Sequence, residues 1–269
     1  MEIIGERING MFKDIKEAIV TGNPAAVKEW AVKQTKMGAA FLDISVGAGA
    51  EKPFEALAFL IEAAQSVVDT PLCLDSTNYD LIESGLKICR VPAMINSCHA
   101  DRYKIERVFP MAVQYGARVI GLAMSEESGI PKTADVRAAL AMELVAAADE
   151  YGLPMEHLYV DPLILPVNVA QDHFSEAMET LRQVKLMADP APKTTCGLSN
   201  CSQRCMHRKI INRTAITLLM GAGLDSAIAD ACDEELLDAV ATARILLNKE
   251  IYCDSYADLY KAPRYDIKA

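Results

Sequence analysis

One repeated pattern constrains the fold of this chain more than any other feature. A helical segment ends at a glycine, and a short apolar run follows that stops at a polar residue, as in Gly38 before Phe41–Asp43 and Gly152 before Leu158–Asp161. Glycine suits the left-handed position just past a helix end. Continuous apolar runs are typical of parallel strands that helices cover. The pattern therefore predicts an α/β fold built on a parallel sheet.

The pattern predicts eight strands along the 269 residues. They are Ile3–Ile8, Phe41–Ser45, Leu72–Ser76, Ala93–Asn96, Val119–Ala123, Leu158–Pro162, Thr194–Ser199 and Ala227–Asp230. Eight βα units in this length indicate a (β/α)8 TIM barrel. An open doubly wound sheet is the alternative, but no Gly-x-Gly-x-x-Gly follows the first strand. With no linker in the sequence, we expect one domain that spans residues 1–269.

Helix starts are signalled by capping residues and prolines between the strands. Asn23 and Pro24 suit an N-cap and a first-turn proline. Similar starts are expected at Pro53, Asp101 and Thr133. The last clear helix is expected at about 234–247. The polar, tyrosine-rich tail after Tyr252 is expected outside the barrel or at a subunit contact.

Charge and composition exclude several classes of partner. The formal net charge is −10 and the pI about 5.0, so nucleic acid and anionic membrane surfaces are poor partners. No apolar run approaches transmembrane length, and the N-terminus lacks a signal-like core. The eight cysteines include several within apolar runs, as in Leu72-Cys73-Leu74, which favours small buried thiols over disulfides. We expect a cytoplasmic protein.

Polar residues stand at the carboxyl ends of the predicted strands, where parallel α/β folds bind ligands. The predicted polar ring comprises Glu6, Arg7, Asn9, Asp43, Asp75, Asn96, Asp161, Ser199, Asn200 and Asp230. Any one of these aspartates alone would be a helix cap. Together, carboxylates and amides match the edge of a planar N–H-rich heterocycle, such as a pterin or a purine. The ring contributes few cations, which argues against a phosphate.

The stretch Lys193–Asn200 is the centre of this prediction. It is expected to be a short buried strand whose Gly197-Leu198-Ser199-Asn200 end exposes backbone and a compact amide. The simpler interpretation is a strand that stops in an Asx-type turn.

Two other groups are candidates for a catalytic or metal site. Cys201, Cys205 and His207 lie close in sequence, but their spacing fits no familiar zinc set, so no metal is expected. Asp172-His173 is expected to be an ordinary loop pair, with an acid–base role as the alternative.

Several motifs, in order and over nearly the whole chain, resemble one family. The chain is similar to the methyltetrahydrofolate:corrinoid/iron–sulfur protein methyltransferases, which are pterin-binding methyltransferases. The motifs are Ile4-Gly5-Glu6-Arg7-Ile8-Asn9-Gly10, Leu72-Cys73-Leu74-Asp75-Ser76-Thr77-Asn78, Ala93-Met94-Ile95-Asn96-Ser97, Asp161-Pro162-Leu163-Ile164-Leu165-Pro166, Asn168-Val169-Ala170-Gln171-Asp172-His173, Gly197-Leu198-Ser199-Asn200 and Ile228-Ala229-Asp230-Ala231-Cys232-Asp233-Glu234.

The resemblance implies a homodimeric barrel of the pterin-binding type. It also implies reversible transfer of the N5 methyl group of methyltetrahydrofolate to cob(I)amide, as in the reductive acetyl-CoA pathway. Asn200 would meet N5 and act in catalysis. The residues implied to bind the folate are Asp75, Asn96, Asp161, Gly197, Ser199, Gln203 and Arg208.

The resemblance implies that this chain holds no cofactor of its own. Methyltetrahydrofolate is the substrate, and the cobamide is carried by a partner corrinoid protein, because no Asp-x-His-x-x-Gly corrinoid signature occurs here. The segment after Asn200 departs from the family pattern, since Cys201, Cys205, Met206 and His207 make it richer in sulfur and imidazole. The identity of the partner is therefore left open.

Three alternatives remain at this point. The same barrel could methylate tetrahydrofolate within a corrinoid-dependent O- or N-demethylase system. A dihydropteroate synthase would need a site for a pyrophosphate leaving group and a different first-strand loop. The chain could also be a non-catalytic folate-binding subunit.

Overall fold

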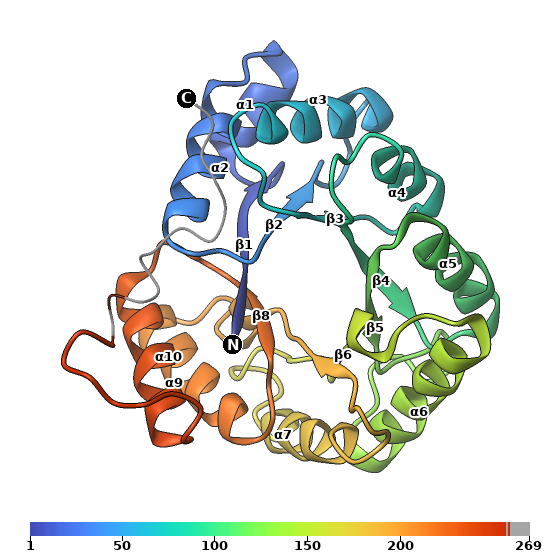
Figure 1. Cartoon of the computed structure of the whole chain (residues 1–269), viewed down its shortest axis with the longest axis vertical. Coiled ribbons are helices and arrows are strands. Elements are labelled where there is room, and N and C mark those ends of the chain that lie inside the picture. Colours follow the sequence, from blue (N-terminus) through green and yellow to red (C-terminus); the bar gives the residue numbers. More distant parts are fainter. Residues whose placement is uncertain (257, 259–269) are drawn as a thin grey trace.

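The computed structural model describes residues 1–256 and 258. Its eight parallel strands surround a central axis, with helices outside them (Figure 1). The strands are β1 (Glu2–Asn9), β2 (Phe41–Ser45), β3 (Leu72–Asp75), β4 (Met94–His99), β5 (Arg118–Leu122), β6 (Leu158–Asp161), β7 (Lys193–Thr194) and β8 (Ser226–Ala229). The predicted (β/α)8 barrel is confirmed.

Helices occupy the connections between the strands. They are α1 (Lys13–Thr21), α2 (Ala25–Lys36), α3 (Pro53–Gln65), α4 (Tyr79–Leu86), α5 (Arg102–Tyr115), α6 (Ala134–Tyr151), the 3-10 turn η1 (Met155–His157), α7 (His173–Val184), α8 (Leu198–Cys201), α9 (Arg208–Gly221) and α10 (Glu234–Leu246). The predicted helix starts at Pro53, Asp101 and Thr133 hold: Pro53 is the first residue of α3, and the other two directly precede α5 and α6.

The sheet runs in the order β7-β6-β5-β4-β3-β2-β1-β8, so β7 and β8 meet where the barrel closes. The backbone pairing there is sparse. Ile228 N–H donates to the Cys196 carbonyl at 2.8 Å, and Gly197 forms an isolated parallel bridge with Ile228. Asp225 completes the seam by accepting the Thr194 N–H at 2.9 Å.

Strand β7 differs from its prediction. The strand expected at Thr194–Ser199 ends at Thr194, and Leu198–Cys201 form the helical turn α8. Small polar side chains such as Ser199 and Asn200 favour turns over strand ladders. The Asn200 N–H accordingly bonds back to the Gly197 carbonyl at 3.2 Å. The polar segment therefore turns at the barrel mouth instead of running past it.

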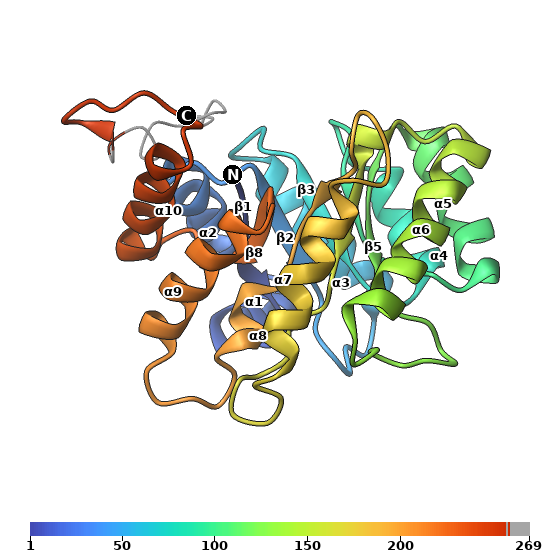
Figure 2. The same cartoon turned by 90° about the horizontal axis from the view of Figure 1, so that it is seen from below.

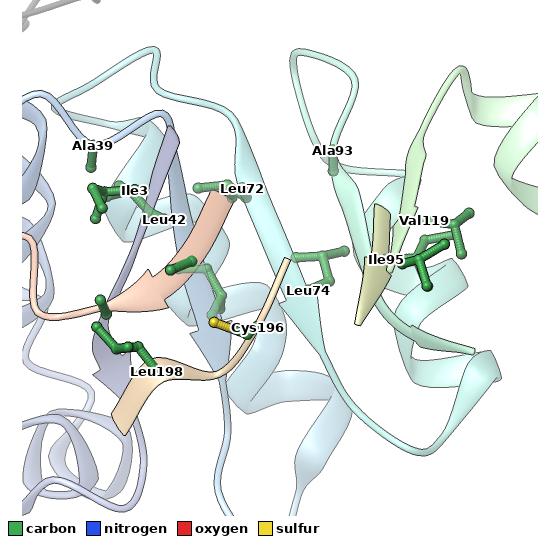
Figure 3. Close-up of a cluster of buried hydrophobic side chains, with 14 of the residues drawn as sticks. Ile3, Ala39, Leu42, Leu72, Leu74, Ala93, Ile95, Val119, Cys196 and Leu198 are labelled. Atoms are coloured by element: carbon green, nitrogen blue, oxygen red, sulfur yellow. The ribbon is translucent and has the colours of Figure 1, made fainter. Parts of the chain in front are cut away.

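Two apolar layers hold the barrel together. Inside it, a closed layer comprises Ile4, Ala40, Phe41, Cys73, Met94, Ile120 and Tyr159. A larger layer lies between the strands and the helices, and Figure 3 shows part of it around Leu42, Leu74 and Ile95. Because strand side chains alternate between faces, the strands β1 to β6 each supply both layers.

The two ends of the barrel differ. In Figure 2 the strands run downward from the N-terminus, so the connections that follow them lie at the lower edge. The segment after α10 lies at the upper edge, away from these connections. Most of the predicted tyrosine-rich tail falls at residues 257 and 259–269, outside the described residues.

Among the described residues, no helix combines the length and the apolar character that a membrane crossing requires.

Gly10 lies where the ends of β1 and β2 pack closely together. Its N–H donates to the Ser45 carbonyl at 2.9 Å, and a Cβ at Gly10 would lie 2.1 Å from the Val46 carbonyl oxygen. Gly10→Ala must therefore push two backbones apart, and we expect a loss of about 2 kcal/mol or more in the free energy of unfolding. Chemical denaturation measures it.

Gly221→Ala is the matched control, because a Cβ there meets nothing within 4 Å. It should leave the stability unchanged or raise it slightly. Equal stability of the two variants would contradict the packing described at Gly10.

Candidate active site

The barrel mouth is polar because of a simple alternation along the strands. Residues two apart on a strand face the same side, and on six of the strands a residue of the inner layer, or packed against it, is followed two positions later by a polar one. These pairs are Ile4 and Glu6, Phe41 and Asp43, Cys73 and Asp75, Met94 and Asn96, Tyr159 and Asp161, and Ile228 and Asp230. On β5 the corresponding residue is Leu122. The predicted ring thus lies at one end of the barrel, directly above an apolar floor.

Asp43, Asp75 and Asn96 form one cluster on β2, β3 and β4. Asp75 and Asn96 are register partners, and the Asn96 amide donates to Asp43 Oδ1 at 3.2 Å. Burial raises the pKa of Asp43 to about 8, with the neighbouring Asp75 charge adding to the shift. Burial also raises the pKa of Asp75. Two adjacent carboxyls that resist ionising together share a proton near neutral pH.

Asp161 lies across the mouth at the end of β6. The Leu163 N–H donates to its Oδ1 at 2.7 Å. Burial raises the pKa of Asp161 to about 6, while the Leu163 and Gly197 backbone N–H groups and the positive charge of Arg137 limit the shift. Near neutral pH this carboxyl is therefore largely ionised and can accept hydrogen bonds.

Glu6 and Ser199 join the first strand to α8. The Ser199 hydroxyl donates to Glu6 Oε1 at 3.0 Å. Burial raises the pKa of Glu6, the Ser199 bond opposes this, and the Asp230 charge adds to the rise. Asp230 accepts the Cys232 N–H at 2.9 Å and so also fixes its own turn.

Asn200 is exposed on α8, at the rim of the mouth. Its amide packs against Gly197, where an added Cβ would lie 2.7 Å from Asn200 Nδ2. A side chain at Gly197 would therefore displace the amide. Gly197 and Asn200 are brought together as the sequence predicted, although on a helical turn instead of a strand tip.

Gln203 and Arg208 lie just beyond α8, and both are exposed. The Arg208 guanidinium donates to the Ser202 hydroxyl and to the Ser199 carbonyl, each at 3.2 Å. Arg208 therefore braces α8 from the solvent side. Gln203 is held at the same rim by its backbone, because its N–H donates to the Asn200 carbonyl at 3.1 Å.

Arg7 does not belong to the ring, which corrects the prediction. Alternation turns its side chain outward, where its guanidinium lies over the rings of Phe12 and Trp30 at 3.7 and 4.2 Å. It also pairs with Asp14 at 3.1 Å. Asn9 accepts the Met11 N–H at 2.9 Å, so its side chain holds the turn after β1.

The two other predicted groups do not assemble a second site. His173 begins α7 with a buried side chain, and its Nδ1 lies 2.9 Å from Arg137, which removes it from acid–base work at the mouth. Cys201 is buried, and burial raises the pKa of its thiol to about 11, whereas His207 is exposed. Within the described part of the chain, no three metal-ligating side chains gather at one point.

The arrangement suits one kind of ligand. Carboxyl groups and one amide surround an apolar floor, so a flat ring can stack over the floor while its N–H edge meets the acceptors. Partly protonated carboxyls add donors beside acceptors, which matches a heterocycle that offers both. A phosphate would meet mostly acidic groups instead.

Comparison with known proteins indicates a pterin-binding enzyme. The model of a family described as pterin binding enzyme matches residues 12–230. A methylcorrinoid:tetrahydrofolate methyltransferase from Eubacterium limosum is 27% identical over 265 residues, which cover 97% of this chain and 96% of that protein. These two matches confirm the resemblance inferred from the motifs.

Two more distant similarities are consistent with it. The methionine synthase of Mycobacterium tuberculosis is 27% identical over 245 residues, which are 85% of this chain and 20% of that protein. A crystal structure of dihydropteroate synthase from Thermus thermophilus superposes with a TM-score of 0.59 at 17% identity, covering 87% of this chain and 91% of that one. The latter likeness shows the barrel fold alone.

The buried carboxyl of Asp43 makes a prediction about stability and pH. Its pKa in the folded chain, about 8, lies above the unfolded value of about 3.9, so the native state binds more protons between these pH values. Stability should therefore fall as pH rises from about 4 to 8. Asp43→Asn removes this titration, and at pH 8 it should exceed the wild type by at least about 1 kcal/mol.

Chemical denaturation at pH 5 and pH 8 measures the effect. The exposed Asp238→Asn, on α10, is the control and should follow the wild type. If Asp43→Asn lost as much stability between the two pH values as the wild type, the raised pKa would be refuted.

Proposed function

The chain belongs to the pterin-binding enzyme family, and from this premise we propose that it transfers a methyl group between N5 of methyltetrahydrofolate and the cobalt of a corrinoid on another protein. The observation that carries the proposal is the ring of buried and half-buried carboxyls above an apolar floor, with an exposed amide at its rim. The near full-length similarity to a methylcorrinoid:tetrahydrofolate methyltransferase supports the choice of reaction.

Binding rests on the acceptors at the strand ends. In this proposal, Asp161 and Asp75 accept hydrogen bonds from pterin N–H groups, and Asn96, already bonded to Asp43, contributes to the same edge. The inner apolar layer supports the flat ring. Gly197 and Ser199 line the side of the site towards α8. Both are small, so the folate can come close to the backbone there.

Catalysis must overcome a poor leaving group. Breaking the N5–methyl bond places an electron pair on nitrogen, and a hydrogen bond or proton at N5 lowers that barrier. Asn200 is the proposed donor, because its amide is exposed at the rim and pinned beside Gly197. An amide cannot protonate N5 fully, so the proton comes from solvent while Asn200 stabilises the developing charge.

The rim also has to admit a large partner. Asn200, Gln203 and Arg208 are all exposed, so the reacting atom would lie near the protein surface. The corrinoid protein would bring its cobalt to this rim, and the cobamide would remain bound to that partner. We also propose a homodimeric, cytoplasmic protein, with residues 1–269 as one domain.

Two physiological directions use the same site, because forward and reverse transfer pass through one transition state. A role in the reductive acetyl-CoA pathway would remove the methyl group from the folate. A corrinoid-dependent O- or N-demethylase system would deliver it to tetrahydrofolate, and the name of the Eubacterium limosum relative favours this second direction. A folate-binding subunit without activity is the non-enzymatic alternative.

The test mixes the protein with methyltetrahydrofolate and photoreduced cob(I)alamin and follows the cobalt spectrum. Methylcobalamin should form at a rate proportional to the protein, and methylcobalamin with tetrahydrofolate should give the reverse reaction. If the protein bound folate but formed no methylcobalamin, the proposed methyltransferase activity would be refuted. The non-catalytic folate-binding subunit would then be the better description. Extensive chelation beforehand should change nothing, since no metal is proposed on this chain.

Asn200→Ala tests the catalytic role directly. Loss of one donor that strengthens in the transition state typically costs about 10²–10³ in rate. We therefore expect single-turnover methyl transfer at saturating folate to slow by about that factor, with the melting temperature unchanged. Gln203→Ala, on the same rim, is the control and should slow transfer far less.

A different outcome for Asn200→Ala would contradict its catalytic role. A near-wild-type rate per folded molecule with a lowered melting temperature would reduce Asn200 to a turn residue.

A further inference from the structure

Arg137 is a fully buried cation behind the proposed folate site. It lies in the first turn of α6, and its side chain is 0% exposed. Its Nε donates to the Pro131 carbonyl at 2.8 Å, and one terminal nitrogen donates to the carbonyls of Pro162 and Leu163 at 2.8 and 3.1 Å. The other terminal nitrogen lies 2.9 Å from His173 Nδ1. One guanidinium thus ties together the connections after β5 and β6.

The tied segment is the turn that carries Asp161. Pro162 and Leu163 follow Asp161 directly, and Leu163 donates its N–H to Asp161 Oδ1. Leu163 also has a φ of 66°, in the left-handed region that side chains other than glycine rarely adopt. Such a backbone persists only where its surroundings hold it. Arg137 holds it through its two bonds to the Pro162 and Leu163 carbonyls.

The charge of Arg137 is not matched by a direct ion pair. Among the described residues, the hydrogen-bond acceptors of its guanidinium are three backbone carbonyls and an imidazole, and none is a carboxylate. An unpaired buried charge is costly. The carboxylates that bear on it are Asp161 and Glu176, and the Ala134 N–H already bonds to Glu176 at 2.6 Å.

We propose that Arg137 is a positioning residue of the folate site: it fixes the Asp161 turn and favours the ionised Asp161 carboxylate that accepts pterin N–H groups. The proposal rests on the proposed function. A Lys could supply the charge but not the planar fork that spans three loop carbonyls. A neutral amide could supply neither the charge nor all of the hydrogen bonds.

The charge of Arg137 affects the ionisation of the Asp161 carboxyl. Arg137 of α6 and the Cys196 thiol are the titratable groups that bear on Asp161, and Glu176 and His173 of α7 face Arg137. Arg137 lowers the pKa of Asp161 against the effect of burial. Removing the cation should therefore raise that pKa and protonate Asp161 at a higher pH.

The first experiment needs no folate. The Asp161 carboxyl is followed by NMR of protein labelled with ¹³C-aspartate, and Asp161→Asn identifies its signal. In Arg137→Gln the titration midpoint should rise, whereas Arg137→Lys should stay closer to the wild type. An unchanged midpoint in folded Arg137→Gln would overturn the electrostatic part of the proposal.

The second experiment is a double-mutant cycle on methyltetrahydrofolate affinity at pH 7, with thermal melts alongside. Arg137→Gln and Arg137→Lys should each weaken binding, the first by about tenfold or more, but by less than twofold in the Asp161→Asn background. Equal losses in both backgrounds would show that Arg137 is merely structural. If Arg137→Gln does not fold, the Arg137→Lys cycle decides.

The two experiments separate the failure of this inference from failure of the proposed function. If Asp161→Asn binds methyltetrahydrofolate as well as the wild type, the folate assignment of Asp161 is wrong. The carboxyl titration would still show whether Arg137 controls Asp161.

Discussion

The site depends on one geometric constraint, the alternation of side chains along eight parallel strands that end at the same mouth. Ile4, Phe41, Cys73, Met94 and Tyr159 close the barrel interior, and the residue two positions on from each is polar. A one-residue shift of any strand that carries a ring carboxyl or amide would turn that group towards the helices. The outer apolar layer prevents such shifts, because Leu42, Leu74 and Ile95 are fully buried there. Packing outside the barrel thus fixes chemistry at its mouth.

Electrostatics then decides what the mouth can hold. The carboxyls of Glu6, Asp43, Asp75 and Asp161 are all raised in pKa, chiefly by burial. Burying acidic groups beside one another destabilises the fold, and a ligand that donates several N–H groups relieves this cost. A pterin edge does so, and an anionic ligand does not. Stability and binding are therefore opposed at this site, as they commonly are at functional sites.

Much of this arrangement could be predicted from the sequence because it depends on local patterns. Apolar runs that stop at Asp43, Asp75, Asn96 and Asp161 indicate both the strands and the ring. Interactions between distant residues could not be predicted in this way. The seam between β7 and β8 relies on the Asp225 side chain, which accepts the Thr194 N–H from 31 residues away. The strand expected to reach Ser199 ends at Thr194. Arg137 gives no local signal in an alanine-rich helix, since its partners lie up to 36 residues away.

The central claim is that ionised Asp161 accepts hydrogen bonds from the bound pterin. Calorimetric titration with methyltetrahydrofolate at pH 6, in two buffers of different ionisation enthalpy, counts the protons exchanged on binding. Asp161, with a pKa of about 6, is half protonated there, so binding should release about half a proton from it. Asp161→Asn should abolish that release. Binding of the wild type with the same enthalpy in both buffers would contradict the account.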